Sequence, residues 1–249
     1  ASAGGNLRIY YANASGGAPN ELLPSNEITG NLSAPNMSAD GSRFTFVADI
    51  TGNGDIYVWS LTGGTPEVAF PTDASENFPV FDGTSQHLAF SRKHNGTEDL
   101  FQWTSAEDKG SLRGGAGDQT RPRWSPHGVL YFTSERGEGS WDIAIVDPSN
   151  SERRIVARDV KLPMRAAPSL TPDQGAVVYV SSESELANAI RVTDLQSGET
   201  VEFETNLVAC GEPAMMRANG RTWLAFTALP NTGSDWRSLH VIDVTDRIP

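Results

Sequence analysis

Short apolar runs recur along the chain between clusters of turn-forming residues, and their spacing predicts β-strands throughout. The runs are rich in aromatic and β-branched residues, as in Phe44-Thr45-Phe46-Val47. Runs this short, bounded by Gly, Asn, Asp and Pro, are typical of strands and not of helices. Runs of a first kind lie at 44–47, 88–90, 130–132, 177–179 and 223–226, and each is followed by one of a second kind at 56–59, 100–103, 143–146, 190–192 and 239–242.

A repeat organises these runs, and prolines mark its register. Two residues after each proline comes a large apolar residue, and then a turn such as Ser38-Ala39-Asp40-Gly41. We expect each proline at the start of the innermost strand of its unit, where a missing N–H costs little. The five prolines are Pro35, Pro79, Pro122, Pro168 and Pro213, at spacings of 44, 43, 46 and 45 residues.

A repeat of about 45 residues that holds about four short strands is typical of a β-propeller blade. One twisted sheet cannot bury both of its faces, whereas blades stacked around an axis cover each other. The sequence therefore predicts an all-β fold, with residues 1–249 forming a single propeller domain of five blades. Six blades are the alternative, and they would need an inner strand that the chain does not display.

The ends of the chain predict how the ring closes. The fifth unit runs only from Pro213 to Pro249, which is too short to include an outermost strand. Residues 6–23 supply surplus strand material, in Ile9-Tyr10-Tyr11 and Glu21-Leu22-Leu23. We expect residues 9–11 to pair with residues 239–244, so that strands from the two termini share the last blade.

The repeat resembles that of the TolB-like β-propeller family, which is related to WD40-like repeats. The copies most similar to it are Ala34–Gly41 and Arg121–Gly128, while the turns at 82–85 and 217–220 lack the family's proline. An aspartate before the second run recurs as Asp55, Asp99 and Asp142. The resemblance implies a non-enzymatic module of the bacterial cell envelope, periplasmic or secreted, that binds a protein or an extended peptide at the channel mouth.

Composition narrows the possible partners. The formal net charge is −12, and an acidic surface repels a nucleic-acid backbone. No apolar run reaches the length of about 18 residues that crosses a membrane, so we expect no membrane insertion. The single cysteine, Cys210, excludes an internal disulfide and is expected to be a small buried apolar residue. A monomer is expected.

The positions just before each proline differ in charge from repeat to repeat. In a propeller these positions converge on one end of the channel, where every blade contributes one loop. We therefore predict a binding site there, with the alternative that its charges only pair with each other in solvent. The candidate residues are Glu76, Asn77, Arg121, Arg165 and Glu212.

An enzyme is the alternative function. A lyase or glycoside hydrolase could use the channel mouth as its pocket, with carboxylates such as Glu76 and Glu212 converging there. The Gly-x-Ser-x-Gly pentapeptide of serine hydrolases does not occur in the chain. We therefore expect no catalytic residues.

Metal binding has one weak candidate. The four histidines do not form the paired spacings of a zinc site. The stretch Asp49–Asp55 offers oxygen atoms around glycines, which suits calcium, but it lacks the spacing of an EF-hand loop. Its place in the repeat matches an ordinary loop between strands, so we expect no metal and no cofactor.

Overall fold

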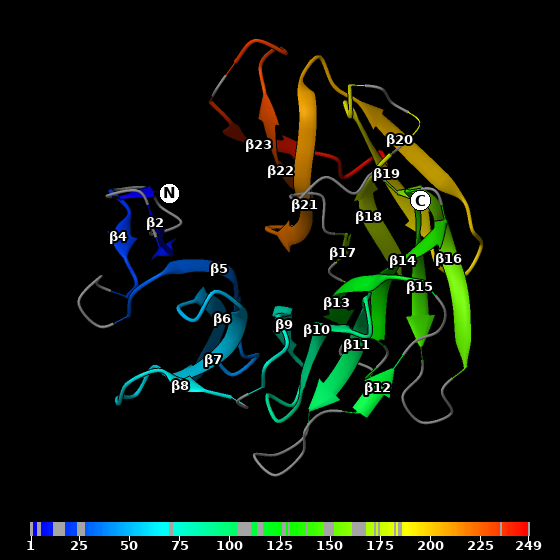
Figure 1. The fold of residues 1–249 in the computed structure, drawn as a ribbon. Helices are drawn as coiled ribbons and strands as arrows, with labels where there is room; N and C mark the ends of the chain where they lie inside the picture. Colours follow the sequence, from blue (N-terminus) through cyan, green and yellow to red (C-terminus); the bar gives the residue numbers. More distant parts are fainter. Residues whose placement is uncertain are drawn as a thin grey trace. The chain divides into compact units, whose positions relative to one another are not determined.

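Strands are the only regular elements in the described part of the chain (Figure 1). The predicted all-β class is therefore confirmed. The computed structural model describes residues 2–3, 6–11, 18–23, 28–69, 72–103, 111–113, 117–125, 128, 130–137, 139–146, 152–160, 168–171, 173, 175–181, 183, 186–234 and 236–248.

The chain divides into two compact units, residues 1–128 and 129–249. The division falls within the third repeat, so the first strand of that repeat belongs to unit 1 and the other three belong to unit 2. The single-domain organisation expected for residues 1–249 stays a prediction.

Five antiparallel sheets follow one another along the sequence, and each is built from consecutive strands. They are the blades of a five-bladed β-propeller, as predicted. The first two sheets are β5 (Asn31–Met37), β6 (Arg43–Asp49), β7 (Gly54–Ser60) and β8 (Glu67–Val68), then β9 (Glu76–Phe81), β10 (Leu88–His94), β11 (Thr97–Trp103) and β12 (Ser111–Arg113). The third and fourth are β13 (Gln119–Trp124), β14 (Leu130–Gly137), β15 (Ser140–Val146) and β16 (Arg153–Val160), then β17 (Ser169–Leu170), β18 (Ala176–Val180), β19 (Ala189–Asp194) and β20 (Thr200–Glu204). The fifth has three strands, β21 (Val208–Ala218), β22 (Arg221–Leu229) and β23 (Ser238–Asp243).

The N-terminal segment forms two short hairpins in unit 1. In the second hairpin the Leu22 amide donates to the Ile9 carbonyl at 2.9 Å, and Ile9 and Leu23 are buried against Leu32 and Phe44 of the first blade. Among the described strand pairs, β3 partners β4 and β23 partners β22, so the closure of the last blade by residues 6–23 stays a prediction. The hairpins are β1 (Ser2–Ala3) with β2 (Asn6–Leu7), and β3 (Tyr10–Tyr11) with β4 (Asn20–Glu21).

Three of the repeat prolines, Pro35, Pro79 and Pro213, lie at β-bulges, and the expectation that each proline begins its strand is wrong for all but one blade. Pro35, Pro79, Pro122 and Pro213 lie inside their strands, and only Pro168 precedes one. In the first blade the pairing passes from Ser33–Val47 to Asn36–Thr45, so Ala34 and Pro35 together oppose Phe46. The same two-against-one arrangement recurs at Phe90 and Phe226. A bulge leaves one residue out of the ladder, so the missing N–H of proline breaks no pairing there.

The residue before the proline adopts a left-handed backbone conformation in four blades. Ala34, Phe78, Arg121 and Glu212 have φ angles of 47°, 53°, 55° and 51°. This conformation is disfavoured for residues with a Cβ atom by about 1–2 kcal/mol. Because four different residues share it, the backbone arrangement before the proline imposes the conformation and the side chain does not.

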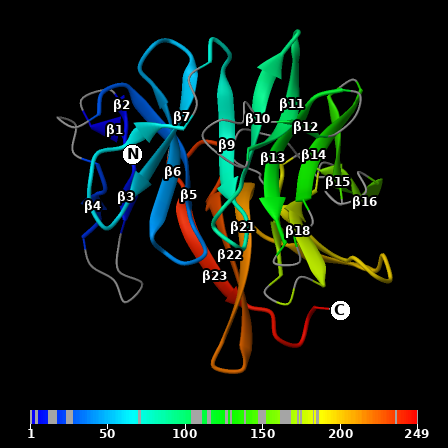
Figure 2. The same cartoon turned by 90° about the horizontal axis from the view of Figure 1, so that it is seen from below.

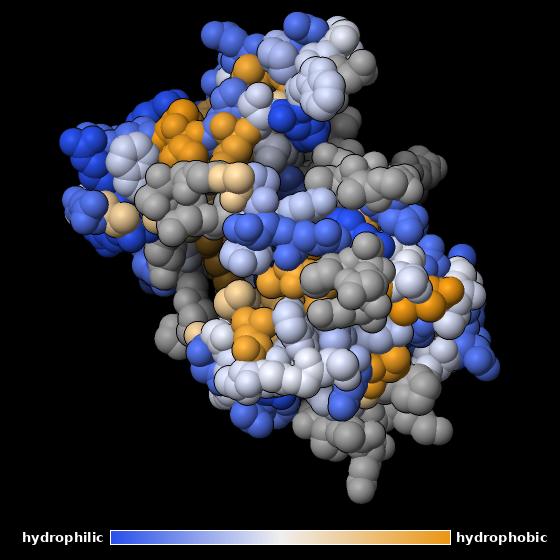
Figure 3. Space-filling view, turned by 90° about the vertical axis from the view of Figure 1, so that its left-hand side faces the viewer, coloured by the Kyte–Doolittle hydropathy of each residue, from blue (hydrophilic) through white to orange (hydrophobic). Residues whose placement is uncertain are grey.

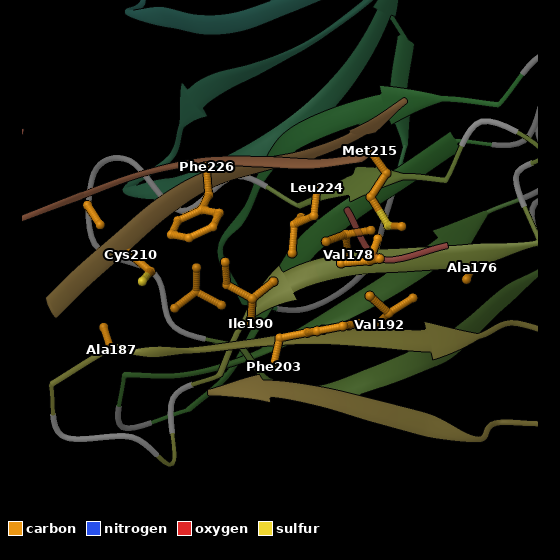
Figure 4. Packing of buried hydrophobic residues seen from close by; sticks show 13 residues of the cluster. Ala176, Val178, Ala187, Ile190, Val192, Phe203, Cys210, Met215, Leu224 and Phe226 are labelled. Carbon is orange, nitrogen blue, oxygen red and sulfur yellow. The ribbon is translucent and has the colours of Figure 1, made fainter. Parts of the chain in front are cut away.

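Apolar packing between successive blades forms the core of each unit. In unit 1, Val47 and Ile56 of the first blade pack against Phe81, Leu88 and Phe90 of the second. In unit 2, residues of β18 to β20 pack against β21 and β22, as Figure 4 shows for Ile190 and Phe203 below Phe226 and Leu224. Cys210 belongs to this second cluster and is 1 % exposed, which confirms it as a buried residue.

Substitutions at Glu212 test the strain imposed by the bulge. Because glycine adopts positive φ freely, Glu212→Gly is expected to be more stable than Glu212→Ala by about 1 kcal/mol. Met216 lies exposed in the same strand without a positive φ. There the order reverses, and Met216→Gly is expected to be less stable than Met216→Ala by about 0.5–1 kcal/mol. Urea unfolding of the four variants measures both differences, and the same order at both positions contradicts the assignment.

A cavity at Phe226 tests the packing between blades in unit 2. Phe226 is 2 % exposed, so Phe226→Ala is expected to lower the free energy of unfolding by about 3–5 kcal/mol. Trp236 is 82 % exposed, and Trp236→Ala is expected to change it by less than about 0.5 kcal/mol. Denaturant titrations of both variants provide the comparison, and equal losses contradict this description of the core.

Candidate binding site

Three of the left-handed positions lie on neighbouring inner strands of unit 1. Strand β9 packs against both β5 and β13, which brings Phe78 between the strands that carry Ala34 and Arg121 (Figure 2). The Arg121 guanidinium lies over the Phe78 ring, with Cζ 4.7 Å from the ring centroid. The left-handed positions of two adjacent blades thus bring together an aromatic ring and a positive charge.

The Arg121 side chain is buried and its hydrogen bonding is incomplete. Arg121 is 6 % exposed, and its Nε and Nη1 atoms have no hydrogen-bond partner among the described residues. Burial lowers the pKa of Arg121, and the nearby Glu98 carboxylate opposes that shift. Buried donors without partners are uncommon because each loses its hydration without replacement.

Glu98 has hydrogen-bond partners for both its carboxylate and its backbone amide. Its Oε1 atom accepts hydrogen bonds from Ser91 Oγ at 2.5 Å and Thr120 Oγ1 at 3.0 Å. Its backbone amide donates to Asp118 Oδ1 at 2.9 Å. Glu98 therefore acts on Arg121 through its charge, while its carboxylate is held by two hydroxyl groups.

A second arginine lies two residues along β13. Burial lowers the pKa of Arg123 to about 10, and repulsion from the Arg121 charge acts in the same direction. Arg123 Nη1 donates a hydrogen bond to the Pro122 carbonyl at 2.9 Å. This end of β13 thus concentrates positive charge in a chain whose net charge is −12.

Glu76 is buried beside this region and pairs with a residue that the sequence analysis did not select. Glu76 has no exposed surface, and its Oε1 atom accepts from Arg92 Nε at 3.0 Å and from the Thr72 hydroxyl. Burial raises the pKa of Glu76, while the hydrogen bonds and charge supplied by Thr72 and Arg92 oppose the shift. Arg92 in turn lies over the rings of Phe90 and Phe101, at 5.2 and 4.6 Å. Glu76 therefore cannot contact a partner in this conformation.

The other predicted site residues are placed as follows. Asn77 follows Glu76 in β9 and pairs with Ser91 of β10. Glu212 is exposed in unit 2 and accepts a hydrogen bond from Thr227 Oγ1 at 3.2 Å. Arg165 lies outside the described residues. The structure thus brings Glu76, Asn77 and Arg121 to two adjacent strands, while the binding role of the set stays a prediction.

The loop proposed for calcium joins β6 to β7. Asp49 pairs with Gly54 across the hairpin, and Thr51 Oγ1 donates to Asp55 Oδ2 at 3.2 Å. Asn53 donates to the Asp73 carbonyl at 3.2 Å. These bonds are those of an ordinary connection between strands. Within the described residues no three His, Cys, Asp or Glu side chains gather as metal ligands do.

Unit 2 has a shallow groove of about 470 Å³ whose charges are largely paired. Arg191 donates to Glu202 at 2.6 Å and also to Glu183, and Arg158 reaches Asp142 at 3.4 Å. The arginines that line the groove therefore have carboxylate partners, whereas Nε and Nη1 of Arg121 have no hydrogen-bond partner among the described residues. On the face seen in Figure 3, hydrophilic residues predominate and apolar ones form small separate groups, as is usual for a protein surface.

The five successive antiparallel sheets define a β-propeller, and comparison with known proteins identifies the family. A family profile described as TolB beta propeller domain matches residues 1–247, and the chain belongs to that family. No curated protein matches the sequence significantly.

Solved structures with the same fold include TolB proteins and a peptidase. TolB from Acinetobacter baumannii is 20% identical with a TM-score of 0.66, over 90% of this chain and 57% of its own. A putative TolB from Agrobacterium tumefaciens is 17% identical with a TM-score of 0.74, over 92% and 81%. A puromycin-hydrolyzing peptidase of Mycobacterium tuberculosis is 14% identical with a TM-score of 0.64, over 98% and 42%. These similarities show the fold.

In the residues that the structure describes, we find no helix with the length and apolar character needed to cross a bilayer.

The Glu76–Arg92 pair gives a pH-dependent prediction. Arg92→Met leaves the Glu76 carboxylate buried without its cation, and is expected to cost about 3–5 kcal/mol at pH 7. The pKa of Glu76 is raised in the folded protein, so the folded state binds a proton more tightly than the unfolded state does. The loss should therefore shrink as the pH falls through the folded pKa of Glu76.

Urea unfolding between pH 7 and pH 5 measures this loss. The double variant Glu76→Gln with Arg92→Met removes the buried charge and is expected to recover much of the stability at pH 7. A loss that is independent of pH and unchanged in the double variant contradicts the role given to the pair.

Proposed function

We propose that this chain is a binding module, and that it takes a protein or an extended peptide at the left-handed positions of its inner strands. The observation that carries the proposal is the left-handed position before four of the repeat prolines. The backbone there is the same in four blades, yet the side chains are Ala34, Phe78, Arg121 and Glu212. Strained backbone positions cluster at functional sites, and here they carry unlike side chains, which supports a role in contacting a partner.

Within unit 1 the partner segment would cross β5, β9 and β13. Phe78 offers an aromatic ring and Arg121 a guanidinium, which are residue types that often dominate binding energy. Glu76 would support this surface from below by holding Arg92, without touching the partner. Asn77, Arg165 and Glu212 are proposed as further contacts.

We place the module in the bacterial cell envelope, in the periplasm or outside the cell. The support is family membership together with the structural similarity to TolB proteins. Peptidases also share the fold. An enzymatic role would need a reactive group at the site, and the carboxylate of Glu76 is instead buried and paired with Arg92.

Affinity capture from a cell-envelope extract tests the proposal. The bait is the wild-type chain beside the variant Phe78→Ala with Arg121→Ala, and the control is Leu239→Ala with Arg221→Ala, which removes the same kinds of side chain from exposed positions. We expect a protein retained by wild type and control and reduced at least about tenfold by the site variant. Glu212→Ala should reduce it by a smaller factor.

Two results contradict the proposal. Equal retention by the site variant and wild type excludes the surface formed by Phe78 and Arg121 as the binding surface. The absence of any protein retained above an unrelated acidic bait argues against a partner-binding function. Unfolding midpoints for all baits show whether each variant is folded.

A further inference from the structure

The unpartnered guanidinium of Arg121 points to the chemistry of its ligand. Arg121 is 6 % exposed, and Nε and Nη1 lack hydrogen-bond partners among the described residues. A guanidinium is a donor only, so an acceptor must satisfy these atoms. The carboxylate of Glu98, whose charge acts on Arg121, has Oε1 engaged by Ser91 and Thr120.

The surroundings of Arg121 favour an anionic acceptor over a neutral one. Arg123 and Arg121 repel each other, and among the described residues the Glu98 charge opposes the effect of burial on Arg121. An anion would be attracted by both arginines, and it would meet Arg121 where solvent is largely excluded. Hydrogen bonds between ionised groups are stronger than neutral ones, and more so at a site of low local dielectric.

The Phe78 ring fixes how the anion would approach. The guanidinium is held at 4.7 Å from the ring centroid, so one of its faces is covered. Its N–H groups lie in the guanidinium plane, and a planar carboxylate matches that geometry better than a single-atom anion does. We infer that Arg121, stacked on Phe78, is a binding site for a carboxylate group carried by the partner segment.

This inference rests on the proposed function for the source of the carboxylate, namely an acidic side chain or a C-terminus of the partner. The site itself can be tested without the partner. Succinate is the probe, added at constant ionic strength with chloride as the replaced anion. Spectra of the arginine Nε–H groups in ¹⁵N-labelled protein report on Arg121 directly.

We expect the Arg121 Nε–H resonance to shift saturably with succinate, with half-saturation on the order of millimolar for so small a ligand. The resonance is assigned by its loss in Arg121→Gln. Arg121→Lys keeps the charge without the planar fork. The succinate concentration that gives half of the thermal stabilisation should be at least about tenfold higher for this variant than for wild type. Arg221→Gln, at an exposed arginine, is the matched control and should bind like wild type.

Thermal unfolding without succinate supplies a second measurement. Because Arg121 has unsatisfied donors, Arg121→Met is expected to melt at or above the wild-type temperature, and to lose the stabilisation that succinate gives to wild type. A melting temperature several degrees lower contradicts the inference, since it means that the protein itself satisfies Arg121.

The remaining outcomes separate this inference from the proposed function. A wild-type resonance that does not saturate, or a succinate effect that persists in Arg121→Gln, overturns the carboxylate site even if a partner is captured. Succinate binding with no captured partner supports the site and overturns the proposed function. A partner whose retention survives when its acidic residues are neutralised also overturns the inference.

Discussion

In three blades a single phenylalanine of the second strand opposes two residues of the inner strand, and much of the remaining structure depends on this contact. Phe46, Phe90 and Phe226 are each almost completely buried. The inner strand accommodates the ring by forming a bulge, and proline is tolerated there because the bulge needs no N–H. The preceding residue is then forced into a left-handed conformation, which sets the direction of the side chain proposed to contact the partner.

Unit 1 contains two buried arginines, Arg92 and Arg121, which differ in how completely their charge and their hydrogen-bond donors are compensated. Arg92 has a carboxylate on one side and aromatic rings around it, so its charge is compensated within the fold. Arg121 has an aromatic ring but no hydrogen-bonded anion among the described residues. The first arrangement is typical of a structural ion pair. The second is the arrangement that we infer to bind a ligand. Sequence position alone does not distinguish the two arginines.

The sequence predicted the strands well because short apolar runs between turn residues have few other interpretations. The runs at 44–47, 88–90 and 223–226 all lie within observed strands. The bulges were not predicted, since a proline is compatible with a strand start as well as with a bulge. Glu98 was missed because the packing of β11 against β13 of the next blade brings it to Thr120. Arg92 was missed because strand pairing, and not spacing along the chain, brings it to Glu76. Glu76 was expected at an accessible mouth, and its burial follows from the same pairing.

The left-handed backbone conformation before the proline does not depend on which side chain occupies the position. Alanine, phenylalanine, arginine and glutamate all occupy one conformation, so a mutation there exchanges chemistry while the architecture persists. The side chain at such a position can therefore change in one blade without a change of fold. The identities of 20% and 14% between this chain and a TolB protein and a peptidase with the same fold are consistent with that freedom.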